Sequence, residues 1–159
     1  MAQPETYAKA QVWLHWAVVA LLAGSFLTHE AMDDALRAAI RGEIAGGAMA
    51  NAHRAFGIVA AVLALARIAM RVQHGAPPLP PGTHPLIALA SRLTHGALYV
   101  LLLAIPFTGA AAWFGPSRDI GEVHGALFNA LAALVALHVA AAVFHQVVLK
   151  DGLMRRMMP

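Results

Sequence analysis

The sequence of 159 residues contains no cysteine and few charged side chains. Without cysteine, the chain cannot form disulfides, iron–sulfur clusters, thiolate zinc sites or the C-x-x-C-H attachment of c-type haem. Charged residues make up 12% of the sequence, against roughly 25% in an average soluble domain. Because 60% of the residues are hydrophobic, the chain has too little charge to cover a globule in water. We therefore interpret it as an integral membrane protein.

The apolar residues are gathered in stretches that are each long enough to cross the hydrocarbon layer of roughly 30 Å as a helix. Four spans are predicted, at about 11–29, 52–72, 86–114 and 121–149. These spans and their loops use up the chain, so no large soluble catalytic domain fits. We expect residues 1–159 to form a single membrane domain, and the fold class to be an all-α transmembrane four-helix bundle.

Two of the connections have distinctive compositions. Residues 31–47 place apolar side chains at helical spacing with charges opposite, which predicts a short amphipathic helix on the membrane surface between the first two spans. Residues 74–85 contain five of the nine prolines and cannot be helical throughout. This segment is expected to be a turn or linker between the second and third spans.

The basic residues predict the orientation of the bundle. With the N-terminus inside, seven of the eleven basic residues lie on the cytoplasmic side: Lys9, Arg67, Arg71, Arg92, Lys150, Arg155 and Arg156. Six of the eight acidic residues lie outside: Glu30, Asp33, Asp34, Glu43, Asp119 and Glu122. The positive-inside rule then places both termini in the cytoplasm and the amphipathic helix in an outer loop. The basic residues are scattered, so binding of nucleic acid is not expected.

The nine histidines are out of proportion in so apolar a chain. His124 and His138 are 14 residues apart, close to four helical turns, so they share one face of the fourth span about 21 Å apart along its axis. His15 and His29 repeat this separation on the first span. Because successive spans run antiparallel, the same spacing predicts two layers. The inner layer holds His15, His95, His138 and Arg67, and the outer layer holds His53, His124 and Gly109, with His29 as an additional candidate.

Two layers of facing imidazoles suggest two haems b, each held by two histidines, because imidazole nitrogen is a suitable axial ligand for haem iron. Gly57, Gly96 and Gly125 lie beside the histidines, where a flat macrocycle needs close approach of the backbone. Arg67 then becomes a candidate counter-ion for an inner haem propionate.

Other interpretations remain open at this point. The histidines could instead bridge helices by hydrogen bonds in a haem-free structural bundle. A metal transporter is less favoured, because the first three spans contain no Asp or Glu in their interiors. His95 and His145, near the inner surface, could hydrogen-bond a quinone carbonyl or carry its proton, or serve only in packing. His74 and His84 flank the proline linker and are expected to be solvated.

Several segments resemble the bacterial cytochrome b561 family of four-helix di-haem b proteins. The matching pieces are LHW at 14–16, the AHRAFG start and ARIAMRV end of the second span, LTHGALYVLLLAIPFTG at 93–109, and the C-terminal segment with its spaced histidines and RMMP ending. The resemblance implies that His15 and His138 ligate the inner haem and that His53 and His124 ligate the outer one. It gives His29 no ligand role.

Some members of this family resemble superoxide oxidases. That similarity implies an oxidoreductase of the bacterial inner membrane that passes electrons from superoxide at the outer face, through both haems, to ubiquinone as substrate or bound cofactor. It also implies that His95 and His145 belong to the quinone region. The predicted outer side is net negative, however, although superoxide, an anion, would be attracted by positive charge there.

The alternative is a haem b membrane anchor that passes electrons from a periplasmic dehydrogenase to quinone. The expected partners are therefore membrane lipid, the quinone pool, and superoxide or a periplasmic redox protein, with the oligomeric state left open.

Overall fold

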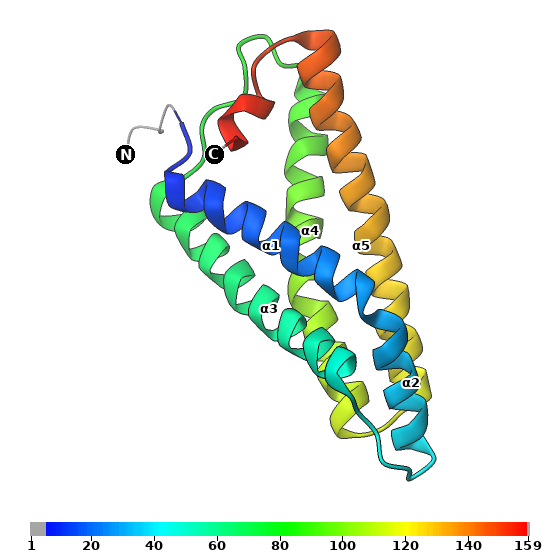
Figure 1. The fold of residues 1–159 in the computed structure, drawn as a ribbon. Helices are drawn as coiled ribbons and strands as arrows, with labels where there is room; N and C mark the ends of the chain where they lie inside the picture. The colour runs from blue at the N-terminus through cyan, green and yellow to red at the C-terminus, as the bar shows by residue number, and fades with distance from the viewer. Residues whose placement is uncertain (1–5, 159) are drawn as a thin grey trace.

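The computed structural model describes residues 6–158, and its regular elements are all helical. The five α-helices are α1 (Lys9–Leu27), α2 (His29–Ile40), α3 (Ala48–His74), α4 (Pro85–Phe114) and α5 (Arg118–Phe144) (Figure 1). A π-helical turn, η1 (His145–Leu149), continues α5, and a 3-10 turn, η2 (Met154–Met157), follows. By length and composition, α1, α3, α4 and the continuous α5 and η1 can each cross a membrane. The prediction of an all-α fold with four spans is confirmed.

The buried core is small and lies where the four spans meet. Val18, Ala64, Leu102 and Leu131 form it, one residue from each span. Most other large apolar side chains point outward, and Phe107, for example, is 76% exposed. Such an extensive apolar exterior marks a surface that contacts lipid rather than water.

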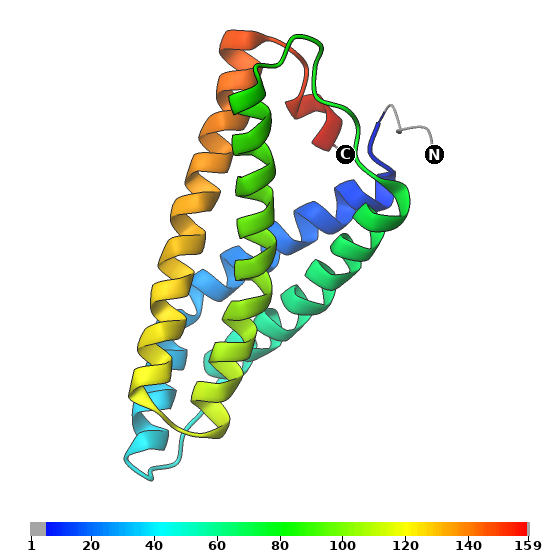
Figure 2. The ribbon, with the colours of Figure 1, turned by 180° about the vertical axis from the view of Figure 1, so that it is seen from behind.

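The spans are arranged as two pairs, with α1 beside α3 and α4 beside α5 (Figures 1 and 2). The pairs diverge toward one end of the molecule, called here the terminal end because the C-terminal turn η2 lies there beside the start of α1. The Trp16 indole N–H donates a hydrogen bond to the Met157 carbonyl at 2.7 Å. The Gln11 amide likewise donates to the Gly75 carbonyl at 3.2 Å. Both described ends of the chain therefore lie on the same side of the bundle.

The opposite end, called the α2 end, carries the predicted amphipathic helix. α2 begins at His29, two residues earlier than expected, and ends at Ile40, after which the chain turns with positive φ at Gly42, Gly46 and Gly47. On the inward face Ala35 is buried, and a Cβ added to Gly121 of α5 would lie 2.8 Å from Leu36. The amphipathic helix is confirmed, and it packs against the ends of α3 and α5.

The proline-rich connection between α3 and α4 has no helix over residues 75–84, as its composition predicts. Pro85 occupies the first turn of α4, where its missing N–H costs nothing. The Leu86 N–H donates to Nδ1 of His84 at 3.3 Å, so His84 caps the helix. His84 therefore has a local structural role beyond that of the solvated loop residue expected.

Candidate functional site

At the α2 end, His53 of α3 faces His124 of α5. Their ring centroids lie 6.3 Å apart, with an angle of 70° between the planes. The His53 Nδ1–H donates to the Ser25 carbonyl at 3.0 Å, and the His124 Nδ1–H donates to the Ile105 carbonyl at 2.9 Å. Metal-bound histidines typically donate their other ring N–H to a backbone carbonyl in this way. Both imidazoles therefore present Nε2 as the nitrogen available to a ligand.

A cavity adjoins these two imidazoles, and the glycines nearby differ in what surrounds them. Gly57 lines the cavity, and a Cβ added there would meet no atom within 4 Å. A Cβ added to Gly109 of α4 would instead lie 2.9 Å from the His124 ring. Gly109 is thus needed for the imidazole to approach α4, whereas the space beside Gly57 can accommodate a flat group.

Toward the terminal end, a second pair repeats the spacing of the first. His15 of α1 and His138 of α5 have ring centroids 6.4 Å apart and planes inclined at 64°. Nδ1 of His15 is buried and has no hydrogen-bond partner within residues 6–158. The His15 ring therefore lacks the backbone carbonyl partner that orients the His53 and His124 rings through Nδ1.

His95 and Arg67 lie in the same layer as this second pair. The His95 ring centroid is 5.2 Å from that of His138, and its Nδ1–H donates to the Ser91 carbonyl at 2.7 Å. The Arg67 guanidinium lies 5.8 Å from the centre of the Tyr99 ring.

A surface pocket of about 390 Å³ opens here between α3 and α4. Its lining includes Arg71, Arg92, His95, Gly96 and Tyr99. The pocket thus combines a histidine of the site with basic side chains.

The spacing within the two pairs fits haem. Metal–imidazole bonds of about 2.0 Å on opposite sides of one metal ion place the ring centroids about 6 Å apart. No group of three or more His, Cys, Asp or Glu side chains in the described part of the chain is arranged to hold a metal ion. Each pair therefore supplies only two ligands. A haem, whose macrocycle supplies the equatorial ligands itself, is the group that this donor set fits.

His145 does not line the pocket that contains His95. Its Nδ1–H donates to Oδ2 of Asp151 at 2.5 Å, and the two side chains are only 15% and 17% exposed. Sequence reasoning did not identify Asp151 as a functional candidate. The one signal for it was its position directly after the last span, because a chain that turns back there can return a side chain to the helix end.

At the α2 end, most of the arginines form ion pairs with the acidic residues of that surface. Three of the four arginines there pair with carboxylates: Arg37 with Asp33 and Asp34, Arg41 with Glu43, and Arg118 with Glu122. Arg54 lies instead over the Trp113 ring at 4.2 Å and donates to the Asn51 side chain. Among the described residues, it is the basic side chain of this end without a carboxylate partner, and it directly follows His53 in the chain.

The remaining histidines lie apart from the two pairs. His29 stacks on Phe26 with ring centroids 5.5 Å apart, and its Nδ1–H donates to the Phe26 carbonyl at 2.6 Å. His74 is exposed at the end of α3, where its Nδ1–H donates to the Met70 carbonyl at 3.3 Å. Both rings make local contacts within or beside their own helices.

Comparison of the chain with known proteins shows the family to which it belongs. Residues 6–159 match the family model described as prokaryotic cytochrome b561. The chain is 35% identical over 158 residues to "Cytochrome b562" of Cereibacter sphaeroides, covering 99% of this chain and 98% of that protein. It is 27% identical to "Probable superoxide oxidase CybB" of Yersinia pestis, covering 96% of each, and 28% identical to "Cytochrome b561 homolog 1" of Escherichia coli, covering 96% and 97%. The chain therefore belongs to the prokaryotic cytochrome b561 family, as a multi-pass bacterial membrane protein that transfers electrons by means of haem b.

Proposed function

We propose that this protein carries electrons across the bacterial inner membrane through two haems b, from a periplasmic donor to ubiquinone. The observation that carries this proposal is the repeated imidazole pair. His53 with His124 would hold one haem, and His15 with His138 would hold the other. Because His124 and His138 lie on α5 about 21 Å apart along its axis, the two sites are at different membrane depths.

The charge distribution supports an orientation with both termini in the cytoplasm. The His53 and His124 pair then faces the periplasm, and the His15 and His138 pair faces the cytoplasm. In this orientation Arg67, which lies over the Tyr99 ring, would neutralise a propionate of the inner haem. We assign His95, whose ring lies 5.2 Å from that of His138, and His145, seven residues beyond His138 in the chain, as the quinone-side groups.

Superoxide is the proposed donor. One relative carries the name "Probable superoxide oxidase CybB", and Arg54, which follows His53 in α3, offers a positive charge that is not paired with a carboxylate of residues 6–158. Two superoxide anions and one ubiquinone, with two protons from the cytoplasmic side, yield two O₂ and one ubiquinol. Bound haem iron would carry one electron at a time between its ferric and ferrous states. The chain's own residues would provide the ligands, the dry interior and the charge that attracts the anion.

A second candidate is a membrane anchor for a periplasmic dehydrogenase. The outward face of α2 favours it, because the Asp33 and Asp34 side chains are 62% and 83% exposed and could meet a basic partner surface. In this case electrons would enter from a docked protein rather than from a small anion, and the route to quinone would be unchanged.

Stopped-flow mixing of the purified, oxidised protein with superoxide tests the proposal. We expect haem reduction at a rate that falls with ionic strength, followed by reduction of added ubiquinone. The His53→Ala variant should lose superoxide-driven reduction while its second haem is still reduced by dithionite. Absence of haem reduction by superoxide in the wild-type protein would favour the anchor function instead.

A further inference from the structure

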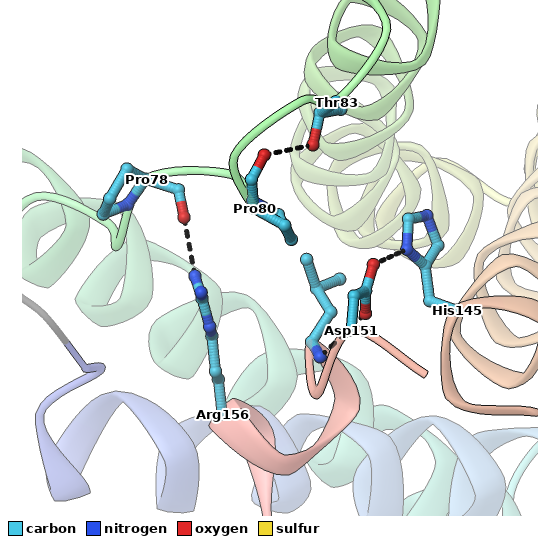
Figure 3. Close-up of polar contacts among 7 residues, drawn as sticks. Pro78, Pro80, Thr83, His145, Asp151 and Arg156 are labelled. Atoms are coloured by element: carbon cyan, nitrogen blue, oxygen red, sulfur yellow. Dashed lines mark hydrogen bonds and ion pairs between the residues drawn. The ribbon is translucent and has the colours of Figure 1, made fainter. Parts of the chain in front are cut away.

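The C-terminal segment brings a carboxylate to the last histidine of the membrane spans. His145 opens the π-helical turn η1, and its Nδ1–H donates to Oδ2 of Asp151 at 2.5 Å (Figure 3). The other oxygen, Oδ1, accepts a hydrogen bond from the Leu153 N–H at 3.0 Å. Both carboxylate oxygens therefore have donors, and the pair is largely shielded from solvent.

Two unusual backbone conformations, in η1 and at Lys150, bring Asp151 to His145. η1 widens the end of α5, and Lys150 then adopts a left-handed conformation with φ 52° and ψ 32°. Lys150 is the one residue other than glycine in the described chain with positive φ. Such a conformation is uncommon for a side-chain-bearing residue, and it turns the chain back toward the helix end. π-helical turns are often found at functional sites.

The C-terminal turn η2 is fixed by hydrogen bonds that do not involve the pair of His145 and Asp151, called here the dyad. The Arg156 guanidinium donates to the Pro78 carbonyl of the proline linker at 2.6 Å (Figure 3). The Trp16 indole holds the Met157 carbonyl from the α1 side. The segment therefore has anchors of its own, and the dyad is not needed merely to keep it in place.

The charges around Asp151 keep it ionised. Partial desolvation raises its pKa, but the hydrogen bonds from His145 and Leu153 and the positive charges of His145 and Arg156 outweigh this, so the pKa lies below its usual value. Across these elements, His145 of η1 and Arg156 of η2 are the titratable groups that act on it. An ionised partner that accepts the Nδ1–H hydrogen bond fixes the orientation of the imidazole and leaves Nε2 available to another group.

We propose that Asp151 is a positioning residue that holds His145 as the proton donor to ubiquinone, an inference that rests on the proposed function. In each transfer the Nε2–H bond of protonated His145 breaks, and an O–H bond forms on a quinone carbonyl oxygen. The quinone receives two electrons through the haems and two protons in this way. His145 regains each proton from water at the terminal end, and Asp151 remains ionised throughout.

The test separates haem reduction from haem reoxidation. Wild-type protein and the Asp151→Asn variant are reduced with dithionite, freed of reductant, and mixed with a short-chain ubiquinone across a range of pH. Asparagine keeps the size of the side chain but removes its charge, so we expect reoxidation to slow by about tenfold or more, a part of the roughly 10²–10⁴-fold that a positioned proton donor contributes. The dependence of the rate on pH should also change. The Arg155→Gln variant is the control, because Arg155 is an exposed basic residue of the same turn, η2, and is not among the groups that act on Asp151.

A second readout does not depend on turnover. In the reduced, diamagnetic protein labelled with ¹⁵N-histidine, the short bond predicts a low-field Nδ1–H resonance that disappears in both Asp151→Asn and His145→Gln. Equal reoxidation rates and pH profiles for wild type and Asp151→Asn would overturn the inference, as would an equal loss in Arg155→Gln. Failure of the wild-type protein to be reoxidised by quinone would overturn the proposed function itself.

Discussion

The imidazole rings of His53 and His124 lie 6.3 Å apart, centre to centre, and α5 repeats almost the same relationship 14 residues later, where His138 lies 6.4 Å from His15. The two pairs use different partner helices but one common helix. The register of α5 therefore sets the separation between the pairs, whereas the positions of α3 and α1 set the spacing within each pair.

Single substitutions at the two pairs should remove haems separately. Replacing His53 by Ala removes a proposed ligand at the α2 end, so the purified variant should hold about half the haem of the wild type. His138→Ala should lose the other half. The measurement is a pyridine haemochrome count with a redox titration of each variant. Loss of all haem from a His53→Ala protein that remains folded would contradict the assignment of two independent sites.

Gly109→Ala should disturb the His124 imidazole. The added methyl group would lie 2.9 Å from the ring, and such overpacking typically costs about 1–3 kcal/mol. Gly24→Ala is a matched control, because its methyl group would lie 2.9 Å from the Phe56 ring and not from a histidine. Thermal unfolding should show lowered stability in both variants, whereas visible spectra should show haem loss or an altered potential mainly in Gly109→Ala. The same spectrum in both would argue against a ligand role for His124.

Gly57→Leu tests whether a group fills the cavity beside His53. A Cβ added at position 57 would have no protein atom within 4 Å, so the folded chain should tolerate the substitution. If haem occupies the space, the leucine should exclude it and the variant should lose the haem at the α2 end. Expression and haem content measured side by side give the answer. Normal haem content in Gly57→Leu would mean that haem does not use this cavity.

Much of this architecture follows from hydrophobicity and spacing alone. The four spans are set by apolar length, and the observed helices begin and end within a few residues of the predicted ones. The layers of histidines follow from helical periodicity, because 14 residues bring a side chain back to the same face. The ligand and quinone-side roles of the histidines stay predictions.

Other contacts depend on tertiary structure that the sequence does not signal. The bond between His145 and Asp151 requires a π-helical turn and a left-handed Lys150, and neither has a local sequence signature. The contact of Arg54 with Trp113 requires α3 and α4 to meet at the α2 end. Counting charges gave a net negative outer side, but it could not show that Arg54 is the arginine left without a carboxylate partner among residues 6–158.

Arg54→Gln should weaken the reaction with an anionic donor. Removing this charge beside His53 should lower the second-order rate of haem reduction by superoxide several-fold at low salt, and less at high salt, where charges are screened. Arg118→Gln changes the net charge equally, but Arg118 is 82% exposed and already paired with Glu122. Its effect should be smaller. Equal effects of the two variants in stopped-flow measurements would show that only the net charge matters.

The central claim, two haems each held between crossed imidazoles, is tested most directly by electron paramagnetic resonance of the oxidised wild-type protein at low temperature. The planes of the paired rings are inclined at 70° and 64°. We therefore expect two low-spin ferric signals of the strongly anisotropic type that crossed axial imidazoles produce, at two haems per chain. A single signal at one haem per chain, or a high-spin spectrum that indicates a missing axial ligand, would contradict the account.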